Sequence, residues 1–363
     1  MANSLKRIGI LTGGGDCPGL NAVIRAVTKA ALAGGIEVVG IEDGYLGLIE
    51  NRLRQLQWSD VSNILTRGGT ILGSCNKANP AQYAVPAGNG YETRDVRDRV
   101  VQNAKDAGLE AIVVIGGDGT MSGASELIDY GINFVGVPKT IDNDLVGTDI
   151  TFGHDTAVTT ASDALDKVHS TAASHHRVMV VEIMGRYAGW LALHSGVASG
   201  SDVILIPEIP FDLDVVAEVC RERSTQGKRF TIIAAGEGAT QAGGEQFVSK
   251  TDPTSPDPIR LGGVAKYVAE EVAQRTDLEA RSIVLGHVQR GGTPTAYDRV
   301  LATQFGHHAF ELMARGEFNR LVVQTEGRIG SIPIKEVAHK VRTIPEDHDL
   351  IRAAKAVGTT FGI

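Results

Sequence analysis

Two turns rich in glycine and aspartate follow apolar runs of the chain. Residues 13–19 read Gly-Gly-Gly-Asp-Cys-Pro-Gly after the run Arg7 to Leu11, and residues 116–120 read Gly-Gly-Asp-Gly-Thr after the run Ala111 to Ile115. Glycine lets backbone N–H groups approach anionic oxygens, and the N-terminus of a following helix attracts phosphate. An aspartate in such a turn, Asp118, would repel a bare phosphate, which indicates a divalent cation between them. The pattern predicts a site for a metal–nucleotide complex.

Neither turn matches the two best-known phosphate-binding patterns. The P-loop pattern G-x-x-x-x-G-K-[ST] is absent from both, and Pro18 and Ser122 stand where G-x-G-x-x-G needs its third glycine. A P-loop and a standard dinucleotide site are therefore unsupported. For each turn taken alone, a tight structural turn between a strand and a helix remains the alternative.

A third segment carries acid–base chemistry. Residues 138–144 read Pro-Lys-Thr-Ile-Asp-Asn-Asp after the apolar run Phe134 to Val137. If this segment is extended, Asp142 and Asp144 project to the same side, with Thr140 in line. Two neighbouring carboxylates raise one pKa, which suits a general base for a hydroxyl, and Lys139 adds a cation for phosphate charge. A solvated Asp-Asn-Asp turn is the alternative.

Further polar side chains follow other apolar runs. Arg186 stands among glycines after residues 178–183, Glu237 follows residues 230–235, and His287-Val-Gln-Arg290-Gly-Gly follows residues 282–285. The guanidinium fork matches phosphate oxygens. Each residue alone is more often a surface or helix-cap residue, but together they predict a polar, phosphorylated sugar as ligand. The adjacent His175 and His176 splay apart in regular structure, so we interpret them as structural or surface residues.

These segments need strands and helices in alternation to position them. Strands are predicted at Arg7–Leu11, Val38–Ile41, Ala111–Ile115, Phe134–Val137, Val178–Ile183, Val203–Ile206, Phe230–Ala235 and Ser282–Leu285. Helices are predicted at Leu20–Ala33, Arg94–Ala107, Ser122–Tyr130, Asp155–Ala172, Val215–Thr225 and Leu261–Arg275. Such alternation predicts parallel sheets, whose strand-end loops share one edge.

The predicted fold class is α/β, with two Rossmann-like three-layer domains, mainly parallel sheets and the active site in the cleft between them. We place the first domain at residues 1–153 plus about 294–340 and the second at 154–293 plus about 341–363. The most linker-like stretch is Gln241 to Pro258, rich in Gly, Ser, Asp and Pro; it could equally be an ordered surface excursion.

Composition limits the class of protein. The chain has 363 residues, 42% of them hydrophobic and 21% charged, which suits two globular domains. A net charge of −8 argues against nucleic acid or a membrane surface as partner. Cys17, Cys75 and Cys220 are widely spaced, so neither a disulfide framework nor a zinc site is indicated. With no signal-peptide layout and no long apolar stretch, we expect a cytoplasmic location.

In their order along nearly the whole chain, these segments resemble the phosphofructokinase family. The combination of Gly-Gly-Asp-Gly-Thr, Pro-Lys-Thr-Ile-Asp-Asn-Asp, Met-Gly-Arg and Gly-His-Val-Gln-Arg-Gly-Gly is far more specific than any one of its members. The resemblance implies transfer of the γ-phosphoryl group of ATP, with Mg²⁺, to the C1 hydroxyl of fructose 6-phosphate. An NAD-type or lipid kinase shares only the first motif. A non-catalytic nucleotide sensor would be expected to lose Asp142.

The resemblance also implies roles for individual positions. The nucleotide would be held by Gly15, Asn76, Lys77, Gly117, Asp118, Gly119 and Thr120, with Asp118 acting through magnesium. Asp142 would be the base on the sugar hydroxyl, and the other catalytic residues would be Lys139, Thr140, Asp144 and Arg186. The sugar phosphate would be held by Thr140, Ile141, Asp142, Met184, Gly185, Arg186, Glu237, His287, Val288, Gln289 and Arg290. A neighbouring subunit would contribute Arg177 and Arg281, which requires a homo-oligomer, by family analogy a tetramer, although a dimer would also serve.

Departures from the family pattern concern the donor and regulation. ATP-using members usually have glycine at the position of Lys139, whereas pyrophosphate-using relatives have lysine there and aspartate at that of Gly119. Glycine at 119 leaves room for an α-phosphate, so we predict ATP, in a subgroup that resembles the mixed-substrate branch; pyrophosphate is the alternative. Asn76 replaces a usual arginine, and we hypothesise that Lys139, with Lys77, supplies the missing charge. Trp58 replaces an arginine of the bacterial effector site, which argues against activation by ADP.

Overall fold

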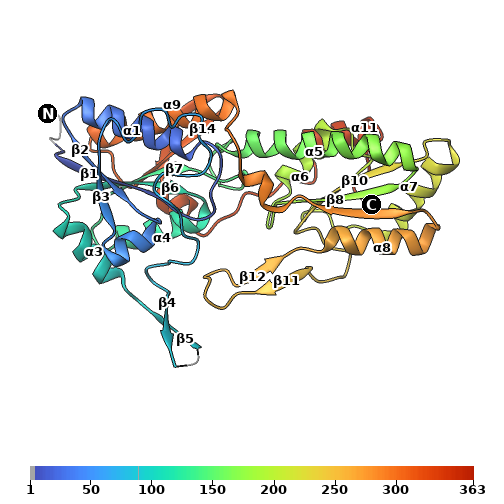
Figure 1. Cartoon of the computed structure of the whole chain (residues 1–363), viewed down its shortest axis with the longest axis horizontal. Coiled ribbons are helices and arrows are strands. Elements are labelled where there is room, and N and C mark those ends of the chain that lie inside the picture. The colour runs from blue at the N-terminus through green and yellow to red at the C-terminus, as the bar shows by residue number, and fades with distance from the viewer. Residues whose placement is uncertain (1–4, 89) are drawn as a thin grey trace.

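The computed structural model describes residues 5–88 and 90–363, which form two α/β halves side by side (Figure 1). The first half contains a seven-stranded sheet in the order β15-β14-β7-β6-β1-β2-β3. Its strands are β1 (Arg7–Thr12), β2 (Glu37–Ile41), β3 (Leu53–Leu56), β6 (Ala111–Gly116), β7 (Phe134–Pro138), β14 (Arg320–Thr325) and β15 (Arg328–Pro333). Only the edge strands β3 and β15 pair antiparallel with their neighbours.

The second half contains a four-stranded parallel sheet in the order β13-β8-β10-β9. Its strands are β8 (Val178–Ile183), β9 (Val203–Leu205), β10 (Thr231–Gly236) and β13 (Ala280–Val284). Two antiparallel hairpins stand outside these sheets: β4 (Tyr83–Ala87) with β5 (Gly90–Arg94), and β11 (Val248–Thr251) with β12 (Ile259–Leu261). The β11–β12 hairpin reaches from the second half toward the first (Figure 1).

Helices cover both faces of each sheet. On the first sheet, α1 (Leu20–Ala33) and α9 (Ala296–Ala314) lie on one face, and α2 (Tyr45–Glu50), α3 (Arg97–Asp106), α4 (Asp118–Ile128) and α10 (Ile334–Val337) lie on the other. On the second, α5 (His154–His175), α6 (Trp190–Ala198) and α11 (Asp349–Ala356) oppose α7 (Leu213–Thr225) and α8 (Val264–Thr276). None of the helices in the described ranges is long and apolar enough to cross a membrane.

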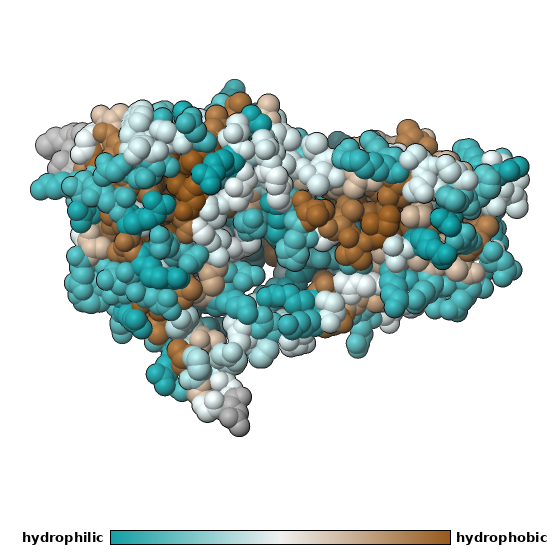
Figure 2. All heavy atoms as spheres, in the orientation of Figure 1, coloured by the Kyte–Doolittle hydropathy of each residue, from teal (hydrophilic) through white to brown (hydrophobic). Residues whose placement is uncertain are grey.

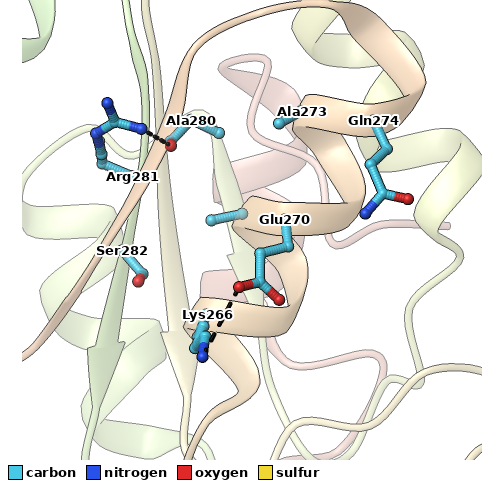
Figure 3. A pocket seen from close by; sticks show the side chains of 8 residues that line it. Lys266, Glu270, Ala273, Gln274, Ala280, Arg281 and Ser282 are labelled. Carbon is cyan, nitrogen blue, oxygen red and sulfur yellow. Dashed lines mark hydrogen bonds and ion pairs between the residues drawn. The ribbon is translucent and has the colours of Figure 1, made fainter.

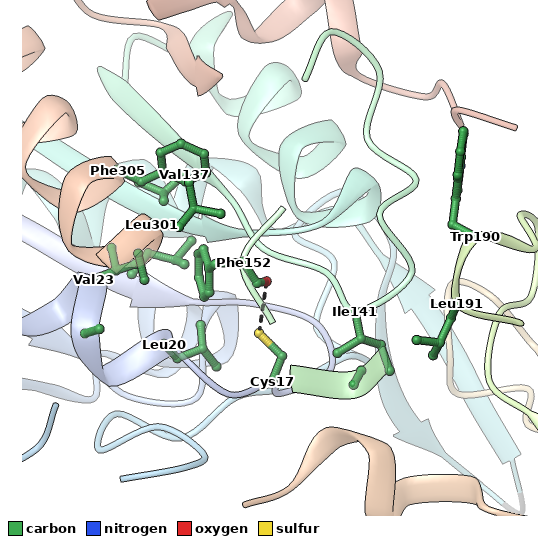
Figure 4. Close-up of a cluster of buried hydrophobic side chains, with 14 of the residues drawn as sticks. Cys17, Leu20, Val23, Val137, Ile141, Phe152, Trp190, Leu191, Leu301 and Phe305 are labelled. Carbon is green, nitrogen blue, oxygen red and sulfur yellow. Dashed lines mark hydrogen bonds between the residues drawn. The ribbon is translucent and has the colours of Figure 1, made fainter. Parts of the chain in front are cut away.

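The alternation of side chains between the two faces of each sheet explains the three layers. Ile8 and Ile10 of β1 face the cluster that contains α1 and α9, whereas Leu11 faces the cluster beneath α2 and α4, because successive strand residues point to opposite sides. One buried cluster continues from the first half into the second. In Figure 4, Cys17 and Phe152 lie on its first-sheet side and Leu191 of α6 lies near Ile141. The strand-end loops of the two halves are therefore held against each other by a shared core.

The order of the first sheet places both glycine turns together. β1 pairs with β2 on one side and with β6 on the other, so successive connections leave β1 in opposite directions. Ligands of open α/β sheets bind at such a switch point, outside the carboxyl ends of the strands. The turns at residues 13–19 and 117–118 lie at this point.

The structure confirms the α/β class, the mainly parallel sheets and each predicted strand and helix, with ends shifted by a few residues. The stretch Gln241 to Pro258 is an ordered excursion that contains β11 and the loop before β12, not a bare linker. The chain after residue 294 adds α9, β14 and β15 to the first half, and Thr360 bridges to Val203 in the second. The domain boundaries remain a proposal.

Candidate active site

The two glycine turns pack on each other through Thr120. The Gly13 N–H donates to the Ile115 carbonyl at 2.9 Å. A Cβ on Gly13 would lie 2.7 Å from Cγ2 of Thr120, and one on Gly116 would overlap the same side chain. Thr120 is buried, so its side chain fills the space that both glycines leave. Glycine is required here by close packing.

The N-terminus of α4 is open to a ligand. Asp118 is the first residue of this 11-residue helix and follows Gly117. Gly119 is exposed, and a Cβ placed there would meet no other part of the described chain within 4 Å. Free N–H groups and the helix dipole favour an anion at this end. The arrangement can hold a phosphate chain above Gly119, with Asp118 beside it.

The loop at residues 73–77 lies against the first glycine turn. The Gly14 N–H donates to the Cys75 carbonyl at 3.3 Å, and the Ser74 hydroxyl donates to the Gly14 carbonyl at 2.5 Å. Asn76 and Lys77 are thereby brought to the same edge of the sheet, both exposed. The Lys77 ammonium pairs with Asp252 at 2.9 Å and with the Thr254 hydroxyl at 3.0 Å. The hairpin of the second half therefore contacts this loop directly.

Lys139 is the buried cation of the site. Only 3% of the residue is exposed, and its ammonium donates to the Gly15 carbonyl. Burial lowers the pKa of Lys139, and the nearby carboxylates of Asp16 and Asp142 oppose that shift. An ammonium held against the first glycine turn can neutralise the negative charge of a phosphate bound there.

The loop from Thr140 to Asp144 is bent, which corrects the expectation of an extended segment. Asn143 has a φ of 52°, a left-handed conformation that breaks the alternation of an extended chain. The Asp142 N–H donates to the Thr140 hydroxyl at 3.1 Å, and Asn143 Oδ1 accepts from the Thr151 N–H at 2.9 Å. A held turn, not strand geometry, sets the directions of the two carboxylates.

Both carboxylates have raised pKa values, mainly because they are buried. Burial, together with the charges of Asp142 and Asp118, raises the pKa of Asp144 to about 7. Burial also raises the pKa of Asp142, whereas the cations of Arg290 and Lys139 lower it. Each keeps one buried carboxylate oxygen without a hydrogen-bond partner among the described residues. The pair can accept a proton or a cation.

The carboxyl end of β8 brings Met184, Gly185 and Arg186 to the cleft. Gly185 has a φ of 132°, and a Cβ there would lie 2.8 Å from the Ala188 carbonyl oxygen, so only glycine fits the turn. The Arg186 guanidinium lies 4.8 Å from the centre of the Tyr187 ring and pairs with Asp257 of the β11–β12 loop. Asp257 comes from the linker-like stretch, where no sequence signal marked it.

Glu237 follows β10 and faces the same space. Burial raises the pKa of Glu237 to about 7, with added repulsion from Asp142 and Glu182, while Arg290 opposes the shift. Glu182 itself accepts from the backbone N–H groups of Gly263 and Ala265, at 2.9 and 3.1 Å, and caps α8. Glu182 is therefore a structural residue, whereas the buried Glu237 carboxyl lies near Asp142 and Arg290.

Arg290 joins the two halves across the cleft. It ends the 3₁₀ helix η1 (Gly286–Arg290), which follows β13, and donates to the Asp16 carbonyl at 3.2 Å. A Cβ on Gly15 would lie 2.7 Å from its Nη1. Arg290, which was predicted to hold the sugar phosphate, therefore lies beside the first glycine turn. Figure 2 shows a hollow bordered mainly by hydrophilic residues where the halves meet.

The other residues of η1 differ in exposure. His287 and Val288 are exposed. Gln289 is fully buried, accepts from the Met184 N–H at 3.4 Å and donates to the Gly286 carbonyl at 3.1 Å. In this structure Gln289 supports the Met184 loop.

Arg177 and Arg281 lie away from this cleft. Both pair with Glu279, at 3.0 and 2.7 Å, at the amino end of the second sheet. Arg281 stands beside Met179 of β8, five residues before Met184, which is roughly 16 Å along a strand that rises about 3.3 Å per residue. Neither arginine can serve the site of its own chain.

Arg281 also borders a shallow groove between α8 and β13 (Figure 3). Lys266 and Glu270 of α8 line the opposite wall and pair with each other, at 3.8 Å. At Trp58, which replaces an arginine of the bacterial effector site, the Lys29 ammonium lies 4.3 Å from the centre of the indole ring. Lys29 is thus already engaged by the residue that replaces the usual arginine.

A divalent cation fits the site only if phosphate shares in binding it. Among residues 5–88 and 90–363, no group of three or more His, Cys, Asp or Glu side chains could hold a metal ion. Mg²⁺ commonly binds one or two carboxylates together with substrate phosphates and waters. Asp118, at the open N-terminus of α4, can supply one such carboxylate.

The geometry is that of an α/β protein in which two glycine turns at the switch point of one sheet face the strand ends of a second sheet. The family profile for Phosphofructokinase matches residues 7–313. The chain belongs to the phosphofructokinase family.

Relatives with assigned names agree on the family and differ in donor. The chain is 49% identical over 364 residues to "ATP-dependent 6-phosphofructokinase 2" of Clostridium perfringens, covering 99% of this chain and 100% of that protein. It is 48% identical to "Pyrophosphate--fructose 6-phosphate 1-phosphotransferase" of Amycolatopsis mediterranei, covering 93% and 96%. Among solved structures, Pichia pastoris phosphofructokinase in the T-state matches with a TM-score of 0.78 and 33% identity, covering 98% of this chain and 36% of the longer yeast chain.

Proposed function

We propose that this protein is an ATP-dependent 6-phosphofructokinase, which phosphorylates fructose 6-phosphate at the C1 hydroxyl to form fructose 1,6-bisphosphate in glycolysis. One observation carries the proposal: Lys139 donates to the Gly15 carbonyl and Arg290 donates to the Asp16 carbonyl, and both cations lower the pKa of the buried Asp142 where the strand ends of the two halves meet. A base and two cations at that point suit an alcohol acceptor and a phosphoryl donor.

Asp142 accepts the proton of the C1 hydroxyl as its oxygen attacks the γ-phosphorus. The bond from that phosphorus to the bridging oxygen breaks, and ADP leaves. Phosphoryl transfer depends mainly on in-line positioning and on compensation of charge, which Lys139 and Arg186 supply. Mg²⁺, when bound, neutralises phosphate charge, and Asp118 would hold it together with the phosphates.

The remaining predicted residues bind and orient. Gly15, Gly117, Gly119 and the loop with Asn76 and Lys77 line the donor side, and Thr120 positions both glycine turns. On the acceptor side we propose Met184, Gly185, Glu237 and His287, with Glu237 accepting from sugar hydroxyls. Thr140 and Asp144 support Asp142.

The open space at Gly119 favours ATP as donor, since a nucleotide needs room for its α-phosphate. A pyrophosphate-dependent enzyme is the second candidate. The buried Lys139 and the Amycolatopsis relative favour it. The same carboxylates and cations would serve either donor, so donor choice must be measured.

We further propose a homo-oligomer in the cytoplasm, a tetramer by family analogy, in which Arg177 and Arg281 reach the site of a neighbouring subunit. Both lie too far from their own cleft to serve it. Val284, Val288 and Val300 are 60%, 62% and 59% exposed on β13, η1 and α9. Apolar exposure of this kind suits a contact between subunits.

The test is formation of fructose 1,6-bisphosphate from fructose 6-phosphate and Mg²⁺, with ATP and pyrophosphate in parallel at matched concentrations. Turnover with ATP alone is expected. Turnover with pyrophosphate alone would support the second candidate, and no turnover with either donor would refute both.

A further inference from the structure

We infer that Arg342 is a positioning residue for the loop that carries Asp142 and Asp144, an inference that rests on the proposed function. Arg342 follows α10, about 200 positions after the loop. Its Nη2 and Nε donate to the Asn143 carbonyl at 2.8 and 3.2 Å. Its own backbone N–H donates to the Asp144 carbonyl at 2.7 Å. One residue thus holds two consecutive carbonyls of the loop.

The bend at Asn143 explains why such a contact matters. Asn143 has a φ of 52°, a left-handed conformation that asparagine adopts more readily than most residues but that contacts must hold in place. The Asn143 side chain is held by the Thr151 N–H, and its carbonyl is held by Arg342. The direction of that carbonyl sets the peptide plane between Asn143 and Asp144. Arg342 therefore helps to aim the two carboxylates on either side of the bend.

Arg342 is itself held from the second half of the molecule. Its guanidinium lies 4.4 Å from the centre of the Trp190 ring, and the Trp190 indole N–H donates to the Arg342 carbonyl at 3.0 Å. Trp190 begins α6. In Figure 4 it lies beside Leu191 on the side of the cluster next to Ile141. A planar cation stacked on an aromatic face has few alternative positions.

The same helix supports a second contact to the loop. His194, one turn after Trp190 on α6, lies 2.7 Å from Nε2 of His154, whose Nδ1 lies 2.7 Å from the Ile141 carbonyl. Burial lowers the pKa of His154 to about 3, so its ring is neutral. Nδ1–H then donates to the carbonyl and Nε2 accepts from His194. α6 thus supports the loop at Ile141 through His154 and at Asn143 through Arg342.

The experiment compares Arg342→Ala and Arg342→Lys with wild type, using fructose 6-phosphate and ATP with Mg²⁺. We expect Arg342→Ala to lower kcat about 100-fold, because a misplacement of about 1 Å costs that much, with both KM values within about threefold. Arg342→Lys should be intermediate, since an ammonium cannot fork. Added guanidinium ion should raise kcat of Arg342→Ala and leave Arg342→Lys unchanged.

Arg352→Ala is the matched control, because Arg352 is an exposed arginine of α11 that pairs with Asp349 of the same helix; its kcat should equal that of wild type. Trp190→Phe keeps an aromatic face but removes the indole donor, so we expect it to lower kcat less than Arg342→Ala does. This variant tests the inference if Arg342→Ala does not fold. If the wild-type enzyme is active, either of two results would overturn the inference. One is a wild-type kcat in both Arg342→Lys and Trp190→Phe, and the other is a rise in KM without a fall in kcat in the Arg342 variants. An inactive wild type would overturn the proposed function and the inference with it.

Discussion

Arg186 and Asp257 form an ion pair that joins the end of β8 to the β11–β12 loop. The Tyr187 hydroxyl donates to the same Asp257 oxygen at 3.2 Å. The Arg186 side chain is 16% exposed and that of Asp257 46% exposed. The Asp257 carboxylate therefore binds the Arg186 guanidinium that we propose for phosphate binding. Asp257 is the more exposed partner of the pair.

We predict that Asp257→Asn strengthens sugar-phosphate binding. Without the carboxylate, phosphate no longer competes for Arg186, and partly exposed pairs contribute about 0.2–1 kcal/mol. KM for fructose 6-phosphate should fall about two- to fivefold, as initial rates would show. Glu245→Gln removes the same charge from an exposed position earlier in the same stretch of chain and should leave KM unchanged. An unchanged or higher KM in Asp257→Asn would contradict the prediction.

The donor prediction is tested at Gly119. Aspartate fits sterically, because a Cβ there meets nothing within 4 Å, but its charge would repel the α-phosphate. Gly119→Asp should lower kcat/KM with ATP at least about tenfold, equivalent to about 1.4 kcal/mol, and spare any turnover with pyrophosphate. Gly119→Asn separates charge from bulk and should have a smaller effect. Equal losses in both variants would show that size decides.

Glu237 should make stability depend on pH. Its pKa is raised from 4.5 to about 7 in the folded protein. Between those values the folded state holds a proton that the unfolded chain has lost, so stability falls as pH rises toward 7. In urea titrations without substrates, Glu237→Gln should become more stable than wild type by about 1–3 kcal/mol between pH 5 and 8. A difference independent of pH would argue against a buried, protonated Glu237.

Shared active sites predict complementation between inactive variants. Asp142→Asn should lower kcat about 10²- to 10⁴-fold by removing the base, and Arg281→Ala should weaken sugar-phosphate binding. After dissociation and reassembly of a mixture, some sites combine an intact Asp142 from one subunit with an intact Arg281 from another. Activity should then exceed the sum of the two separate variants. No recovery in verified mixed oligomers would place Arg281 outside the neighbouring site.

Much of the architecture could be predicted from the sequence, because local periodicity determines it. Apolar runs such as Val178–Ile183 are buried on both sides and became strands as predicted. Glycines at 13 and 116 marked turns where no side chain fits. The motif residues at the ends of β6 and β7 could be assigned to one edge of one sheet, and those at the ends of β8 and β10 to one edge of the other, because parallel strands present their carboxyl ends at one edge.

Tertiary structure alone decided how those residues are held. The bend at Asn143 depends on Thr151 and on Arg342, about 200 positions away, and the partner of Arg186 lies in a stretch without periodicity. Hydrogen bonds and ion pairs between distant segments leave no periodic trace in the residues that make them. The kinds of chemical group in the site were therefore readable from the sequence, whereas their directions, burial and charge states arise only when the two halves pack together.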